Sequence, residues 1–175
     1  MHIEPLFDEA RVRGRIAELA DEIARDQADA GLALVCIAEG AVRFTDALES
    51  ALRACRVATR RLDVAVRRTR GTRLGPVQVG AFDPDALEGC DVLVVDDVAD
   101  EGDTLRAVLG LAASGEPRRL RSAVLVDKRG RRSGPLRIDY AGFVVESGWV
   151  VGFGMDADGA WRELDWIGRL VDERF

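Results

Sequence analysis

The sequence predicts an α/β protein with a central parallel sheet flanked by helices on both faces. Short apolar runs, typical of strands buried on both faces, alternate along the chain with segments whose apolar residues recur at helical spacing. Such alternation favours a parallel sheet with helical crossovers. The chain has 175 residues, 47% of them hydrophobic, which suits one substantial core. We therefore expect a single domain over residues 1–175.

The first third of the chain carries two helix patterns around a strand. An amphipathic helix is expected from Asp8 to Asp29, where apolar residues line one face and charges fill the other. Gly31 follows, and the continuous apolar run from Leu32 to Ile37 is typical of a buried strand. A second helix pattern covers Ala41 to Arg56.

The middle of the chain repeats this alternation. Strands are expected at Leu62–Val66, Val92–Val95 and Leu120–Val126, and a helix at Thr104–Ala113. Between the first two of these strands, residues 67–76 are rich in arginine and glycine and almost without apolar side chains. This composition predicts a flexible loop that includes Arg67, Arg68, Thr69 and Arg70.

After Asp127 the pattern changes to short apolar stretches interrupted by glycines. Gly142–Val145 and Trp149–Phe153 are expected to form short strands near the edge of the sheet. We expect a small hood over about residues 142–175, joined by the N-terminus.

Composition excludes several classes of function. The net charge of -6 and the pI of about 4.9 argue against nucleic acid as the main partner. Residues 1–9 lack the basic and apolar stretches of a secretory signal, and no apolar run is long enough for a bilayer. We therefore expect a cytoplasmic protein without membrane contact. Cys36, Cys55 and Cys90 are odd in number and widely spaced, which favours reduced core cysteines.

The stretch from Leu93 to Thr104, LVVDDVADEGDT, runs from an apolar strand into carboxylates and a helix start. Carboxyl ends of parallel strands face the ligand crevice, and a helix N-terminus offers backbone amides to a phosphate. Paired carboxylates can accept hydrogen bonds from sugar hydroxyls or hold a divalent cation. A simpler interpretation is equally open from spacing alone: Asp100 and Asp103 cap the helix, while Asp96 and Asp97 are solvated.

This stretch resembles the phosphoribosyl-pyrophosphate (PRPP) signature of type I phosphoribosyltransferases. The resemblance implies their fold, with Asp96 and Asp97 at the ribose hydroxyls and Asp100 beside purine N7 as general base. A carboxylate there can take a proton from the base and stabilise positive charge on the sugar. The 5-phosphate would be wrapped by Asp100, Glu101, Gly102, Asp103 and Thr104.

Three later segments resemble hypoxanthine-guanine phosphoribosyltransferases in order and spacing: Val126–Arg129, Asp139–Phe143 and Trp149–Asp156. The resemblance implies that Lys128, the only lysine, donates to the exocyclic oxygen of a 6-oxopurine, although a surface lysine is the simpler interpretation. Trp149 would stack on the purine, with a core tryptophan as the alternative. The remaining implied roles are base contact for Val150 and Asp156, Mg²⁺ binding for Asp156 with Asp96 and Asp97, and pyrophosphate contact for Arg162. A homodimer or homotetramer is also implied.

Three segments depart from the family pattern. Ala38, Glu39 and Gly40 stand at the pyrophosphate loop without a lysine, and Glu39 should repel pyrophosphate unless it points away or binds the cation. Glu101 stands where the signature has a small or hydroxylated residue, beside the expected 5-phosphate, so either its side chain swings outward or the ligand is not the usual one. The segment 67–73 replaces the family's Ser-Tyr pair with arginines, which could bind phosphate, dock an acidic partner or be solvated.

The expected function is transfer of a phosphoribosyl group from PRPP to a 6-oxopurine, with Mg²⁺ and release of pyrophosphate. Two alternatives stay open: transfer to another flat, oxygen-bearing heterocycle, and a non-catalytic nucleotide-binding regulator on the same fold. The sequence does not rank hypoxanthine, guanine and xanthine.

Overall fold

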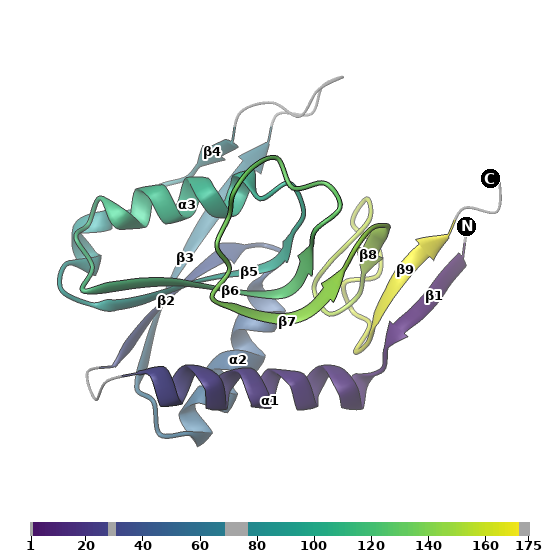
Figure 1. The fold of residues 1–175 in the computed structure, drawn as a ribbon, viewed down its shortest axis with the longest axis horizontal. Coiled ribbons are helices and arrows are strands. Elements are labelled where there is room, and N and C mark those ends of the chain that lie inside the picture. The colour runs from purple at the N-terminus through teal and green to yellow at the C-terminus, as the bar shows by residue number, and fades with distance from the viewer. Residues whose placement is uncertain (1, 28–30, 69–76, 172–175) are drawn as a thin grey trace.

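The computed structural model describes residues 2–27, 31–68 and 77–171, and these form two sheets and three α-helices (Figure 1). The larger sheet has six strands, parallel except for the antiparallel edge strand β4. The predicted fold class is therefore confirmed. In spatial order the strands are β4 (Val77–Val79), β3 (Thr59–Arg68), β2 (Leu32–Ala38), β5 (Asp91–Ala99), β6 (Arg119–Lys128) and β7 (Tyr140–Val145).

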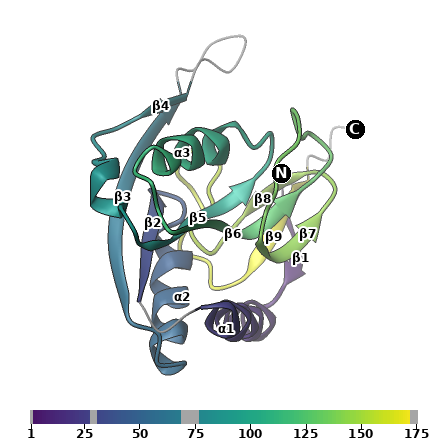
Figure 2. The same cartoon turned by 60° about the vertical axis from the view of Figure 1, so that its left-hand side comes forward.

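Helices cover both faces of this sheet (Figure 2). α1 (Glu9–Asp26) and α2 (Val42–Ala54) pack on one face, and α3 (Asp103–Ala113) packs on the other beside the short 3₁₀ helix η1 (Pro84–Leu87). Side chains of a strand point alternately to its two faces. In β2, accordingly, Leu34 joins the core under α1 and α2, while its neighbour Val35 joins the core under α3.

The first helix begins where a capping side chain satisfies a free backbone amide. Asp8 accepts a hydrogen bond from the Arg11 amide at 2.8 Å, as expected of an N-cap aspartate. Its buried face repeats at helical spacing through Val12, Ile16, Leu19, Ala20 and Ile23. The helix ends at Asp26, before the predicted end at residue 29, and residues 28–30 lie outside the described part of the chain.

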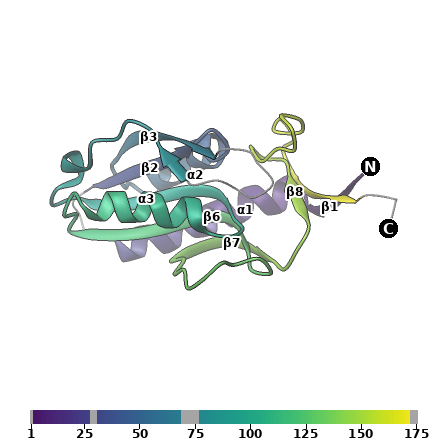
Figure 3. The same cartoon turned by 90° about the horizontal axis from the view of Figure 1, so that it is seen from above.

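The smaller sheet is antiparallel and joins the two ends of the chain: β1 (His2–Phe7), β9 (Ile167–Val171) and β8 (Trp149–Val151). It lies beyond one end of the large sheet (Figure 3). The predicted hood is thus present, although the sequence analysis predicts no strand at residues 2–7, where Pro5 and Glu4 obscure the alternation. Residues 142–145 belong to β7 of the large sheet, so the hood starts after this strand.

Three strands extend by two or more residues beyond their predicted C-terminal ends because pairing continues past their apolar runs. β3 extends through Arg67 and Arg68, which pair with Gln78 and Val77 of β4, so the predicted loop starts two residues too early. Thr69 and Arg70 lie outside the described residues. The other two longer strands are β5, which extends through the paired aspartates to Ala99, and β6, which extends to Lys128.

Two smaller expectations concern the cysteines and the membrane. Only Cys36 is buried, whereas Cys55 and Cys90 are partly exposed, so the prediction of three core cysteines is correct for one of them. All three thiols are free. Among the described residues, no helix combines the length and the apolar character needed to cross a membrane.

Candidate active site

A cavity of about 190 Å³ opens at the carboxyl ends of β5 and β6, between the large sheet and the hood. This is where a parallel α/β sheet places its ligands. Its lining comes from β5, β6, β8 and the turns that follow β5 and β8. The lining residues are Asp97, Val98, Asp100, Lys128, Trp149, Val150, Met155 and Asp156. Sequence reasoning missed only Val98 and Met155, although each lies next to a predicted site residue in the chain.

Asp100 and Lys128 form an ion pair in the wall of this cavity. The Lys128 ammonium donates to Asp100 Oδ2 at 2.8 Å, and the lysine is only 6% exposed, so the surface interpretation of Lys128 is wrong. The other carboxylate oxygen, Asp100 Oδ1, is buried and accepts no hydrogen bond from any described residue. A buried carboxylate oxygen without a donor is costly. It is therefore suited to accept a proton or a hydrogen bond from a bound molecule.

Asp96 and Asp97 are held by the backbone at the end of β5. The Asp97 amide donates to Asp96 Oδ1 at 3.0 Å, and the Val98 amide donates to Asp97 Oδ1 at 2.9 Å. Burial raises the pKa of both carboxyls, and the negative charge of Asp97 raises the pKa of Asp96 further. Asp96 is 5% exposed, which rules out a solvated side chain. Across the described residues, neither aspartate has an ion pair with lysine or arginine.

Asp97 and Asp156 form the part of the cavity best suited to a cation. Both line it, and the charge of Asp156 contributes to the raised pKa of Asp97. Mg²⁺ commonly binds one or two carboxylates and takes its other ligands from water and phosphate oxygens. In the described ranges, no group of three or more His, Cys, Asp or Glu side chains is arranged around a metal position. The residues therefore fit a Mg²⁺ ion that shares its ligands with a phosphorylated substrate.

The turn after β2 packs tightly against this carboxylate. A Cβ atom on Gly40 would lie 2.1 Å from Asp97 Oδ2, so any larger residue at this point would displace the Asp97 carboxylate. A Cβ atom on Gly154 would lie 2.5 Å from the Gly40 carbonyl oxygen. Residues 38–40 are thus packed closely between β5 and the segment after β8. The peptide bond between Ala38 and Glu39 is cis.

Glu39 reaches from this turn to the hood. Its Oε2 accepts a hydrogen bond from Arg162 Nη1 at 2.9 Å, and Arg162 Nη2 donates to Asp156 Oδ1 at 2.9 Å. The bonds to Glu39 and Asp156 raise the pKa of the guanidinium. The structure therefore brings together Glu39, Arg162 and Asp156. The Glu39 carboxylate points towards the Arg162 guanidinium.

The loop between β5 and α3 ends at Gly102, the N-cap residue of the helix. Gly102 has φ +85°, a conformation that side-chain-bearing residues rarely adopt, and its Cβ would lie 2.7 Å from Leu136. Asp103 and Thr104 form the first turn of α3. The N-terminal amides of this helix point along its axis and suit an anion.

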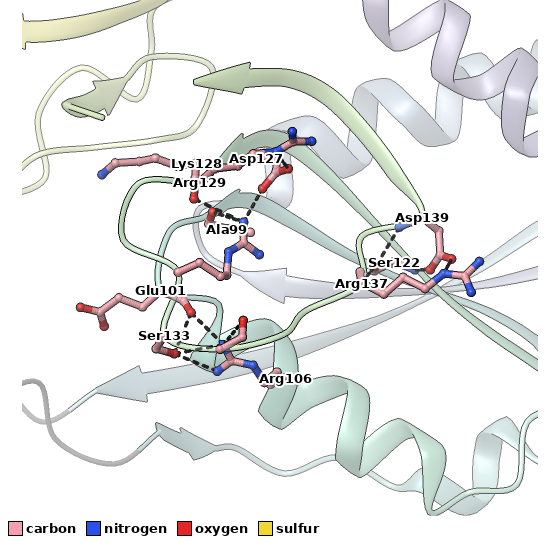
Figure 4. Close-up of polar contacts among 12 residues, drawn as sticks. Ala99, Glu101, Arg106, Ser122, Asp127, Lys128, Arg129, Ser133, Arg137 and Asp139 are labelled. Atoms are coloured by element: carbon pink, nitrogen blue, oxygen red, sulfur yellow. Dashed lines mark hydrogen bonds and ion pairs between the residues drawn. The ribbon is translucent and has the colours of Figure 1, made fainter. Parts of the chain in front are cut away.

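Glu101 of this loop and Asp103 of α3 are paired with arginines that sequence reasoning missed. Arg131 donates to Glu101 Oε1 at 3.1 Å, and Arg106 donates to Asp103 Oδ1 at 2.6 Å. Ser133 adds a hydrogen bond to the Glu101 carbonyl oxygen at 3.0 Å. Figure 4 shows the Glu101 carboxylate pointing away from Arg106. The basic run after β6 (residues 129–132) was the available signal.

Trp149 is exposed beside the cavity. Its side chain is 56% exposed, and its Nε1 donates to the Asp156 carbonyl oxygen at 3.1 Å, so the core interpretation of this tryptophan is wrong. The neighbouring Val150 is buried in β8, paired with Arg169 of β9. A flat apolar ring fixed at one edge and open on its faces is suited to stacking on an aromatic ligand.

This fold is that of a phosphoribosyltransferase. The family model described as "Phosphoribosyl transferase domain" matches residues 2–158, and the chain belongs to this family. Among its relatives are the hypoxanthine phosphoribosyltransferase of Escherichia coli strain K12, 29% identical over 97% of this chain and 96% of that protein, and the hypoxanthine-guanine phosphoribosyltransferase of Mycobacterium avium, 34% identical over 94% and 84%.

The fold of the chain is also similar to solved structures of hypoxanthine phosphoribosyltransferases. The hypoxanthine phosphoribosyltransferase of Trypanosoma cruzi, in complex with its product IMP, superimposes with a TM-score of 0.89 at 31% identity, over 98% of this chain and 95% of that one. The predicted resemblance is thus confirmed for fold and family.

Proposed function

We propose that this protein transfers the 5-phosphoribosyl group of PRPP to a 6-oxopurine and releases pyrophosphate, as a purine-salvage enzyme of the cytoplasm. The observation that carries the proposal is the buried Asp100 Oδ1, which has no hydrogen-bond partner in the described part of the chain and lies in one cavity with Lys128 and Trp149. Family membership supports phosphoribosyl transfer, and the similarity to hypoxanthine and hypoxanthine-guanine phosphoribosyltransferases supports a purine acceptor.

Recognition of the base falls to three residues in this proposal. Trp149 would stack on the ring, and the Val150 backbone would contact its edge. Lys128 uses one of its three N–H donors on Asp100 at 2.8 Å, which leaves donors for the exocyclic oxygen of the purine. Adenine carries an amino group at that position, so it would face the ammonium with hydrogens and bind poorly.

The proposed chemical step is a displacement at the anomeric carbon of PRPP. A ring nitrogen of the purine forms the new bond to this carbon while the bond to pyrophosphate oxygen breaks. Asp100 Oδ1 takes the proton from the purine, and its negative charge stabilises the positive charge that develops on the sugar. The pyrophosphate leaves with the electron pair of the broken bond.

The rest of PRPP would be held around this point. Asp96 and Asp97 are proposed to lie at the ribose hydroxyls, and residues 100–104 with the N-terminus of α3 at the 5-phosphate. Arg162, with the backbone of residues 38–40, would contact the pyrophosphate. Mg²⁺, bound to Asp97 and Asp156, would supply charge neutralisation for the pyrophosphate.

The proposal is tested by offering the purified protein Mg²⁺, PRPP and, separately, hypoxanthine, guanine, xanthine and adenine. Formation of nucleotide and an equal amount of pyrophosphate with at least one 6-oxopurine, but not with adenine, is expected. Transfer to adenine alone, or to another heterocycle alone, would assign a different base. The order of preference among the three 6-oxopurines is left to the same assay.

A second candidate function is a nucleotide-binding regulator without transfer activity. The specific observation in its favour is the Glu39–Arg162 ion pair, which places a carboxylate where the leaving pyrophosphate needs positive charge. A regulator would bind a purine nucleotide or PRPP in calorimetry while releasing no pyrophosphate with any base. The assay above therefore separates the two candidates.

A further inference from the structure

The guanidinium of Arg162 is shared between two carboxylates that differ in how firmly they are held. Glu39 and Asp156 both accept from it at 2.9 Å. Asp156 is also bound by the Gly159 amide at 2.6 Å and has a side chain 26% exposed. The Glu39 side chain is 78% exposed, and among the described residues its ion pair is with Arg162. Glu39 is thus the partner that can leave.

The backbone around Arg162 is fixed independently of Glu39. The Arg162 carbonyl oxygen accepts from Arg43 Nη1 at 2.9 Å and from the Gly154 amide at 3.1 Å. Release of Glu39 would therefore free the tip of the arginine side chain without displacing the loop that carries it.

One donor of this arginine is already in need of an acceptor. Arg162 Nε is buried and has no hydrogen-bond partner among the described residues. An anionic oxygen of a ligand could replace Glu39 at Nη1, because a guanidinium binds phosphate oxygens as well as carboxylates, while Nε, whose N–H lies on the Nη2 side of the group, needs an acceptor of its own.

We propose that Glu39 is an internal competitor for Arg162: it occupies the guanidinium in the free protein and is displaced by the pyrophosphate group of PRPP or by pyrophosphate itself. This inference rests on the proposed function, because it takes Arg162 as a pyrophosphate contact. The Glu39 carboxylate therefore lowers the affinity of the protein for both ligands. It also favours release of pyrophosphate, because the Glu39–Arg162 ion pair forms again as the product leaves.

The experiment is calorimetric titration of pyrophosphate and of PRPP, each with Mg²⁺, into the wild type and Glu39→Gln. The variant keeps the size of the side chain and removes its charge. We expect both ligands to bind about fivefold more tightly, the order of effect of an exposed ion pair. The gain should shrink in high salt, which screens exposed charges.

Glu18→Gln is the matched control. Glu18 accepts from Arg15 at 2.9 Å, and Arg15 is likewise shared with a second carboxylate, Glu22, at 2.8 Å. This cluster lies on α1, which lines no part of the cavity. Its loss should leave both affinities unchanged.

Three other results are distinguishable. Unchanged or weaker binding by Glu39→Gln, with wild-type binding intact, would overturn the competition and leave the proposed function standing. Binding of neither ligand by either protein would contradict both. Tighter binding by Glu39→Gln without transfer to any base would support the competition and contradict the transferase.

Discussion

Strand β5 has buried aspartates at both ends, and their surroundings are opposite. Asp91, at the start, is 2% exposed and is bound by Arg118 at 2.7 Å and Gln27 at 2.9 Å. The hydrogen bond from Arg118 lowers the pKa of this carboxyl, although burial acts in the other direction. Asp96 and Asp97, at the other end, have raised pKa values because burial is not offset by a cation.

This difference separates structure from function along one strand. Asp91 ties the end of α1 and the start of β6 to β5, and its interactions are complete in the free protein. At the opposite end, Asp96 and Asp97 form no ion pair with a described lysine or arginine, and Asp100 Oδ1 has no hydrogen-bond partner among the described residues. Buried polar groups are costly when unsatisfied, so such a cluster is expected where a ligand completes it.

The largest effect is expected from Asp100→Asn. The amide cannot take the purine proton, so kcat should fall by about 100-fold or more, the contribution of a general base. Thermal unfolding should change little, because the side chain is partly exposed and Asn keeps its size. Steady-state kinetics with PRPP and the preferred base provides the measurement, and wild-type turnover in the variant would refute the assigned role.

Lys128→Met should act on base binding. It keeps the aliphatic stem but removes the donors for the exocyclic oxygen, so KM for the base should rise about tenfold to 100-fold while KM for PRPP changes less. The control is Lys128→Arg, which retains a charge beside Asp100 but has a planar fork in place of the compact ammonium. An equal rise in both KM values would show that Lys128 maintains the site as a whole and does not act specifically on the base.

Asp91→Asn should act on stability alone. The variant loses the carboxylate charge that Arg118 binds, so the free energy of unfolding at pH 7, measured with urea, should fall by about 1 to 2 kcal/mol. Because folding lowers the pKa of Asp91, its stabilisation is complete above the unfolded-state pKa of about 4 and is lost as the pH falls through the folded-state value. The gap between variant and wild type should therefore close in acid, and kcat should be unchanged at pH 7.

Trp149→Ala should give the smallest effect. Loss of one stacking partner is expected to raise KM for the base about threefold to tenfold. The midpoint of thermal unfolding should stay near that of the wild type, since the side chain is 56% exposed. Trp149→Phe, which restores a flat ring, should recover most of the affinity; failure to recover it would point to the Nε1 bond to Asp156 instead.

The sequence was sufficient for the parts of the fold that local pattern determines. The buried strands and amphipathic helices were predicted because apolar spacing reflects burial directly. β1 was not, because its pairing with β9 depends on residues 160 or more positions away. The length of β5 was underestimated for a similar reason: its polar end is kept extended by β6.

The candidate site was predicted unevenly. The residues on the base side were available from motif resemblance, and the structure brings Asp100, Lys128 and Trp149 to one cavity. Arg162 was predicted as a pyrophosphate contact, but the ion pairs between arginines and acidic residues on the phosphate side were not foreseen, because the partners are brought together only by folding. Arg131 reaches Glu101 across 30 positions, and Arg162 reaches Glu39 across 123.

The most direct test of the account is the double variant Asp91→Asn with Asp100→Asn, compared with each single variant for kcat and for urea unfolding. The two positions are about 30 Å apart along an extended strand, so independent roles should be additive. We predict that the double variant has the free energy of unfolding of Asp91→Asn and the kcat of Asp100→Asn. A loss of kcat in Asp91→Asn, or a stability loss in Asp100→Asn as large as that in Asp91→Asn, would contradict the division of β5 into a structural and a ligand-binding end.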